Sequence, residues 1–175
     1  MVGLKRTHSC GELNKQNVGQ EVVLCGWVAR RRDHGGLIFL DLRDRSGLVQ
    51  VVFSQDNSKE IFNKAEAVRN EYVLAVRGNV SLRDASTVNS NMFTGEIEVL
   101  GTELRILNAA KTPPFYIQDN IDVDETLRLK YRYLDLRRPE MQNNLVLRHR
   151  VTKAMRDFFD RNNFLEIETP MLTKS

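Results

Sequence analysis

The sequence predicts an all-β OB-fold barrel of five strands, with a helix between strands three and four, followed by a linker and the start of an α+β domain. Two observations predict it: the order of strand-like and helix-like segments in residues 1–107, and the change to proline, charged and helical patterns from residue 108. Three strands, a helix and two strands form the connectivity of an OB-fold, which binds oligonucleotides and oligosaccharides. An SH3-like barrel is the competing fold, but it normally lacks that helix.

Runs of β-branched and aromatic residues mark the first three strands, at residues 22–28, 37–42 and 48–53. Turn-forming residues 43–47 join the second strand to the third, so these two are antiparallel neighbours. Phe39 and Gln50 therefore lie on adjacent strands. We expect Arg30, Arg31 and Arg32 to end the first strand and enter a turn.

The hydrophobic period then changes to that of a helix. Apolar residues recur at helical spacing at Ile61, Phe62, Ala65 and Val68. Asn57 or Ser58 is available as the N-cap of this helix. Strand character returns at residues 72–80 and again at 96–100, continuing past Gly101 to Leu107. These segments complete the five strands of the barrel.

The remaining residues predict a linker at 108–138 and the beginning of a second domain at 139–175. Pro139 is well placed at the first position of a helix. An apolar stripe follows it at Leu147, Val151, Ala154, Met155 and Phe158. Asn163 suits the left-handed end of this helix, and residues 164–169 alternate as a strand that Pro170 ends. One helix and one strand cannot bury a core, so we expect the chain to be truncated inside this domain.

Composition excludes several classes of protein. Hydrophobic residues make up 41% of the 175 residues and charged residues 28%, which is typical of a globular protein rather than a disordered one. No apolar run is long enough for a transmembrane helix, and the N-terminus lacks the pattern of a signal peptide, so we expect a cytoplasmic protein. Cys10 and Cys25 have no zinc-site spacing and are expected as reduced thiols. No catalytic constellation and no metal site are expected in this chain.

Charge and side-chain type favour binding of a nucleic acid. The net charge is only +3, but basic residues dominate 1–32 and 128–161, on either side of an acidic strip at 118–127. Two basic zones suit an anionic partner, although charge alone favours the interpretation that these are solvated surfaces. Phe39 on a barrel strand can stack a base, Gln50 can hydrogen-bond a base edge, and Glu98 can accept from an amino group. A core phenylalanine and a solvent-facing glutamine are the alternative interpretations, and pattern alone does not separate them.

Three blocks of sequence resemble one family in order. Residues 25–44, from Cys25-Gly26-Trp27-Val28 through Leu37-Ile38-Phe39-Leu40-Asp41-Leu42-Arg43-Asp44, resemble the anticodon-binding domain of bacterial aspartyl-tRNA synthetases. Residues 128–139 resemble the segment that opens the catalytic domain of that family. Residues 164–170 resemble class II motif 1, whose helix, strand and proline build the dimer interface, which implies that Phe164 and Pro170 lie in one.

The resemblance also implies the residues that contact the anticodon. The family's arginine, stacking aromatic, glutamine and strand-five glutamate fall on Arg32, Phe39, Gln50 and Glu98, and an arginine after strand four falls on Arg83. The turn position of His34 resembles a specificity switch. Histidine there is typical of enzymes that charge the asparagine tRNA as well as the aspartate tRNA. A second determinant falls near Ser86, where glycine is expected.

The family's activity implies the partners of the whole enzyme. It is an aspartate–tRNA ligase, which activates L-aspartate with ATP and Mg²⁺ and transfers it to tRNA(Asp), and in the non-discriminating branch also to tRNA(Asn). Motifs 2 and 3, which bind ATP, lie beyond Ser175, so the chain itself is expected to bind no cofactor and to be inactive. A homodimer is implied when the second domain is complete. The alternative function is a non-enzymatic OB-fold module that binds single-stranded nucleic acid.

Overall fold

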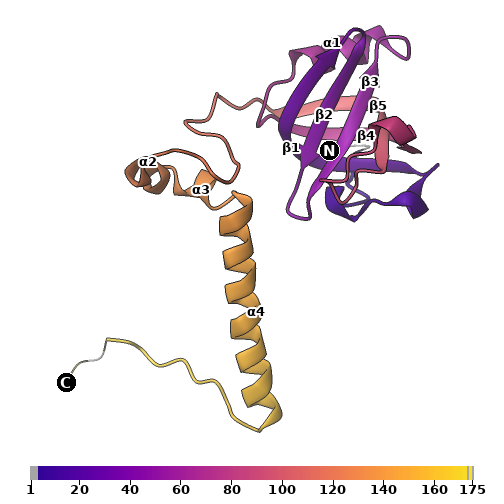
Figure 1. Ribbon diagram of the computed structural model, residues 1–175. Coiled ribbons are helices and arrows are strands. Elements are labelled where there is room, and N and C mark those ends of the chain that lie inside the picture. Colours follow the sequence, from indigo (N-terminus) through magenta and orange to yellow (C-terminus); the bar gives the residue numbers. More distant parts are fainter. Residues whose placement is uncertain (1–3, 173, 175) are drawn as a thin grey trace. The chain divides into compact units, whose positions relative to one another are not determined.

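The structure, a computed structural model, describes residues 4–172 and residue 174, and the chain separates into two compact units. The first unit ends at Pro114 and the second begins at Phe115. Figure 1 shows a β-barrel in the first unit and helices in the second.

The first unit is a closed five-stranded barrel (Figure 1). Its strands are β1 (Glu21–His34), β2 (Leu37–Arg43), β3 (Leu48–Ser54), β4 (Val73–Leu82) and β5 (Ile97–Asn108), and they pair in the order β1-β2-β3-β5-β4. The pairs are antiparallel except for β3 and β5, which run parallel. Helix α1 (Lys59–Ala67) lies between β3 and β4 in sequence, and Ser58 caps it by accepting a hydrogen bond from the Ile61 backbone N–H. This confirms the predicted OB-fold.

Strand β1 is longer than predicted, and the expectation that the three arginines end it was wrong. Arg30, Arg31 and Arg32 all pair with β2, and β1 continues to His34. The register shifts between Val28 and Arg30, which marks a β-bulge, and the apolar run that predicts the strand ends at this bulge. The turn itself is formed by Gly35 and Gly36, both with positive φ.

The core of the barrel is made by inward-facing aliphatic residues of all five strands. Buried members include Val22, Leu24, Ile38, Leu40, Leu42, Val49, Val51, Leu74, Val76, Ile97 and Val99. Phe62 and Ala65 of α1 join this cluster, as do Cys10 and Leu13 of the N-terminal segment. That segment contains the short 3₁₀ helices η1 (Cys10–Glu12) and η2 (Lys15–Asn17), and a third, η3 (Ala85–Thr87), follows β4. Because every second strand residue faces this core, the others form the outer face of the barrel.

The second unit consists of α2 (Glu125–Lys130), α3 (Arg132–Asp135) and α4 (Pro139–Arg161). Asp135 is fully buried and accepts from Arg132 Nη1 at 2.5 Å and lies 3.0 Å from Arg138 Nε, so one carboxylate organises the basic segment before α4. Pro139 occupies the first turn of α4, and Asn163 has φ 63°, as the sequence predicted.

The apolar stripe of α4 is exposed in this unit. Leu147, Val151, Met155 and Phe158 are each more than half exposed, and none of the helix residues is buried. Residues 164–169, expected as a strand, have no secondary structure here. A strand forms only against a hydrogen-bonded neighbour, and the segment instead folds back through a bidentate ion pair between Arg156 and Glu166.

In the part of the chain that the structure describes, none of the helices is long and apolar enough to span a membrane. Nor do residues 4–172 and 174 contain a group of three or more histidine, cysteine, aspartate or glutamate side chains arranged to hold a metal ion. Cys10 and Cys25 are both free thiols, the first buried and the second half-buried.

Candidate nucleic-acid interface

Strand register brings four of the predicted site residues to one outer face of the barrel. Arg32 of β1 is the cross-strand partner of Phe39 on β2. Gln50 of β3 lies opposite Asp41, two residues along β2 from Phe39 and therefore on the same side of the sheet. Glu98 of β5 precedes Val99, whose partner is Val51 of β3. Neighbouring strands thus bring residues distant in sequence next to one another.

These four side chains form one continuous set of contacts. Arg32 Nη2 donates to Gln50 Oε1 at 3.1 Å, and Gln50 Nε2 donates to Glu98 Oε2 at 2.9 Å. The guanidinium carbon of Arg32 lies 5.9 Å from the centre of the Phe39 ring, within cation–π range. Gln50 is 6% exposed and Phe39 is half-buried, so Gln50 is not a solvent-facing side chain and Phe39 is not a core residue.

Arg83 joins the same set from the end of β4. Its Nε donates to the backbone carbonyl of Ile97 at 3.0 Å, which fixes the guanidinium beside the start of β5. Burial lowers the pKa of Arg83, while the nearby carboxylates of Glu98 and Asp41 raise it. Its Nη2 and the Nε of Arg32 are buried donor atoms without a hydrogen-bond partner. We call Arg32, Phe39, Gln50, Arg83 and Glu98 the outer-face cluster.

Asp41 is a cluster neighbour that the sequence analysis did not single out. Its Oδ1 lies 2.5 Å from Arg32 Nη2, and its side chain is only 14% exposed. The signal that identifies it is the strand period, because residues two apart on β2 share a face and Phe39 was already a candidate. Burial raises the pKa of the Asp41 carboxyl, and the guanidiniums of Arg32, Arg30 and Arg83 oppose that rise.

The two predicted determinants of tRNA choice lie in different surroundings. His34, at the exposed end of β1, packs the edge of its ring against Phe39, with ring centres 5.7 Å apart. Ser86 lies in η3, where its hydroxyl donates to Asp84 Oδ1 at 2.6 Å and its backbone N–H donates to the same atom at 2.9 Å. His34 therefore touches the outer-face cluster directly, whereas the contacts of Ser86 hold the loop after β4.

The predicted interface residues of the second unit are exposed. Phe164 packs its ring on Phe159 with centres 5.6 Å apart, yet 64% of Phe164 remains accessible. Pro170 is also exposed. Like the stripe on α4, both residues are uncovered in this unit.

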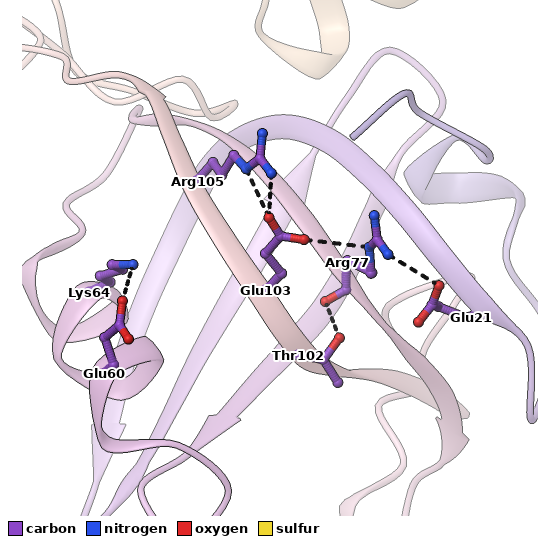
Figure 2. A network of polar contacts seen from close by, with 7 residues as sticks. All are labelled: Glu21, Glu60, Lys64, Arg77, Thr102, Glu103 and Arg105. Atoms are coloured by element: carbon purple, nitrogen blue, oxygen red, sulfur yellow. Dashed lines mark hydrogen bonds and ion pairs between the residues drawn. The ribbon is translucent and has the colours of Figure 1, made fainter. Parts of the chain in front are cut away.

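A second set of charged residues lies on the β4–β5 side of the barrel, and its positive and negative charges balance one another (Figure 2). Arg77 lies 3.7 Å from Glu21 and 3.6 Å from Glu103, and Glu103 also pairs with Arg105 at 2.7 Å. Two arginines and two glutamates neutralise one another here. This set differs from the outer-face cluster, because its own four members are all charged residues.

Two family models match this chain, one in each unit. Residues 22–107 match the family model of the OB-fold nucleic acid binding domain, and residues 124–175 match that of the class II tRNA synthetases (D, K and N). A solved structure, asparaginyl-tRNA synthetase from Pyrococcus horikoshii, superposes with a TM-score of 0.82 at 27% identity, covering 97% of this chain and 39% of that one.

Curated relatives are closer in sequence. The aspartate–tRNA(Asp/Asn) ligase of Heliobacterium modesticaldum is 69% identical over 173 residues, covering 99% of this chain and 29% of that protein. The ligase of the same name from Symbiobacterium thermophilum is 68% identical, covering 98% of this chain and 29% of that protein. The chain spans less than a third of the length of these relatives. Over that region the chain is a close homologue of the aspartate–tRNA(Asp/Asn) ligases, with an OB-fold domain and the start of the class II synthetase region.

Proposed function

We propose that this chain is the anticodon-binding and hinge region of an aspartate–tRNA ligase. The observation that carries the proposal is the outer-face cluster, in which an aromatic ring, a fixed amide and two guanidiniums share one barrel face. The Phe39 ring supplies a stacking surface for an unpaired base, and such stacking contributes about 1–3 kcal/mol per base. Arg32 and Arg83 are each only partly buried, so their guanidiniums can donate to oxygen atoms of the RNA.

Gln50 supplies sequence selectivity in this proposal. A primary amide carries two donor hydrogens and two acceptor lone pairs. Arg32 and Glu98 each use one side of the Gln50 amide, which leaves one N–H and one lone pair for a base edge. Glu98 adds a carboxylate that accepts from an amino group of a base. A face of this kind reads bases that are splayed out of a single-stranded loop.

The names of the relatives support a proposal for the activity of the whole enzyme. We infer ATP-dependent activation of L-aspartate and its transfer to tRNA(Asp), and also to tRNA(Asn), since the relatives are named for both tRNAs. We assign ATP and Mg²⁺ to the part of the enzyme outside this region. His34, in contact with Phe39, is the residue we assign to acceptance of both tRNAs.

The second unit supports the enzyme over the alternative of a free-standing binding module. Its sequence matches the class II synthetase model, and its long helix carries an apolar stripe that a module binding only nucleic acid would not need. We propose that the stripe, Phe164 and Pro170 contribute to a homodimer interface.

Binding of labelled tRNA transcripts tests the proposal. We expect the chain to bind tRNA(Asp) and tRNA(Asn) at least tenfold more tightly than tRNA(Phe), with affinity falling as salt rises. The matched control is a tRNA(Phe) transcript carrying the aspartate anticodon loop, which should recover most of the affinity. Equal affinity for all transcripts would reject an anticodon-binding function and favour non-specific nucleic-acid binding.

A further inference from the structure

We propose that Asp41 is a positioning residue of the outer-face cluster: it holds the guanidinium of Arg32 in the orientation that fixes the amide of Gln50. The inference rests on the proposed anticodon-binding function and extends it to a residue outside the contacting set. Its physical basis is a chain of three contacts, from Asp41 to Arg32, from Arg32 to Gln50, and from Gln50 to Glu98.

One nitrogen atom makes the first two of these contacts. Arg32 Nη2 has two hydrogens, and the structure directs one to Asp41 Oδ1 and the other to Gln50 Oε1. The two strong acceptors therefore determine the rotation of the guanidinium. Without the carboxylate of Asp41, the amide oxygen of Gln50 is the one hydrogen-bond acceptor that Arg32 keeps among the described residues. Its guanidinium is then free to turn toward the carboxylate of Glu98.

The orientation of the Gln50 amide depends on Arg32 in turn. The amide oxygen faces a group that only donates, and the amide nitrogen faces Glu98, which as a carboxylate only accepts. Rotating the amide by half a turn would set donor against donor and acceptor against acceptor. The donor–acceptor order that Gln50 offers to a base edge is therefore fixed while Arg32 stays in place.

The position of Asp41 is costly for a carboxylate, which argues against an incidental surface charge. Its side chain is 14% exposed, and burial raises its pKa. Arg30 is its cross-strand partner on β1, and Arg32 and Arg83 complete the set of guanidiniums that oppose this rise. Five charged groups therefore lie around this position: the carboxylates of Asp41 and Glu98 and the guanidiniums of three arginines. Removing the charge of Asp41 leaves this face more positive as well as less ordered.

The two effects of losing Asp41 act in opposite directions on RNA binding. Lost order of Gln50 weakens discrimination between bases, whereas an added positive charge strengthens binding to any RNA and steepens its salt dependence. For single strands, one more neutralised phosphate changes the slope of log K against log salt by about 0.7. A residue that only supported the fold would weaken binding to all RNAs alike. These signatures separate positioning from a purely structural role.

The test uses two anticodon stem-loops, that of tRNA(Asp) and the same loop with its middle base replaced, bound to the 175-residue chain at several salt concentrations. We expect D41N to lower the ratio of the two affinities at least tenfold, while the replaced loop binds as well as before or better. D41E, which keeps the charge, should recover part of the ratio. The control is D33N. Asp33 pairs with Arg31 of the same strand, β1, at 2.9 Å, and it lies opposite the core residue Ile38 of β2. It makes the same charge change and should leave the ratio unchanged.

A second variant keeps the proposal testable if D41N folds poorly. R32K cannot bridge Asp41 and Gln50 with one planar group, so it should lower the ratio to the same extent, and the double variant should lose no more than either alone. A D41N chain with the wild-type ratio, or one that loses affinity equally for both loops, would overturn the role of Asp41. Equal binding of both loops by the wild-type chain would overturn the proposed function itself, and the role of Asp41 with it.

Discussion

Gln50 and Glu98, separated by 48 residues in sequence, are joined by a hydrogen bond of 2.9 Å from the glutamine Nε2 to the glutamate Oε2. The parallel pairing of β3 with β5 brings them together, because Val51 lies opposite Val99 and the preceding residues share an outer face. An amide that is buried and held at both ends presents its remaining groups in fixed directions. This pre-organisation distinguishes the cluster from an ordinary basic surface.

Replacing the ring of Phe39 should weaken RNA binding without unfolding the barrel. We expect Phe39→Leu to lower affinity for the tRNA(Asp) anticodon stem-loop by roughly 5- to 150-fold, which corresponds to the loss of one stacked base. Fluorescence anisotropy measures this directly. Phe93→Leu is the control, since Phe93 is 87% exposed on the loop before β5 and lies outside the cluster. The same loss in both variants would contradict a stacking role for Phe39.

Asp44 should make the stability of the barrel depend on acid pH. Burial would raise its pKa, but hydrogen bonds from the Ser46 hydroxyl and from the backbone N–H groups of Cys10 and Ser46 outweigh burial and lower it. Since the folded-state pKa is depressed, this stabilisation is present above the ordinary carboxyl value and is lost as pH falls through the folded value.

Urea unfolding of Asp44→Ala at several pH values checks this expectation. The variant should be less stable than the wild type at pH 7 by less than the about 1.5–3 kcal/mol that hydrogen bonds to a charged group contribute, because solvent screens the partly buried Asp44. The difference should shrink toward pH 3. A difference that stays constant across this range would show that the ionised carboxylate is not its source.

His34→Leu should shift the full-length enzyme toward the aspartate tRNA. The two anticodons differ in their third base, cytosine against uracil, and an imidazole can donate or accept according to its tautomer, whereas leucine can do neither. Aminoacylation of both tRNAs should be comparable for the wild type, and the variant should favour tRNA(Asp) about tenfold or more, a change of about 1.4 kcal/mol. If the wild type charged tRNA(Asn) a thousandfold more slowly than tRNA(Asp), the assignment of His34 would be wrong.

The apolar stripe of α4 should make the chain self-associate. Leu147, Val151, Met155 and Phe158 are each more than half exposed, and surfaces of this kind associate with a second apolar surface. Met155→Lys should weaken association at least tenfold, since burying one such side chain contributes about 1.5–3 kcal/mol. His149→Lys adds the same charge outside the stripe and should have little effect. Sedimentation velocity showing the wild type as a monomer at all concentrations would refute this.

The sequence predicts the barrel well because its strands and turns have local signals. The apolar runs at residues 37–42 and 48–53, and the cap at Ser58, depend only on near neighbours. The extension of β1 through Arg30 to His34 was missed because the apolar run ends at Ala29, where the register shifts and charged residues follow. Residues 164–169 show the opposite error. Their alternating pattern predicts a strand, but a strand forms only when a neighbouring strand is present to pair with it.

The candidate site was predictable as residue types but not as a network. Resemblance to a known family indicated Arg32, Phe39, Gln50, Arg83 and Glu98, whereas pattern alone left open whether Phe39 is a core residue and Gln50 a solvated one. Gln50 is buried and bonded to Glu98, and no local signal in sequence reports a contact between two strands. Asp41 was overlooked for a related reason, since its importance comes from the arginines around it.

Mapping the RNA contact surface by NMR tests the central claim most directly. A ¹⁵N-labelled chain titrated with the tRNA(Asp) anticodon stem-loop should show chemical-shift changes concentrated at Arg32, Phe39, Gln50 and Glu98. Signals from the self-neutralised set on the β4–β5 side, including Arg77 and Glu103 (Figure 2), should stay in place. Changes centred on Arg77 and Glu103, with the Gln50 side-chain amide unmoved, would contradict the assignment of the outer-face cluster as the anticodon-binding surface.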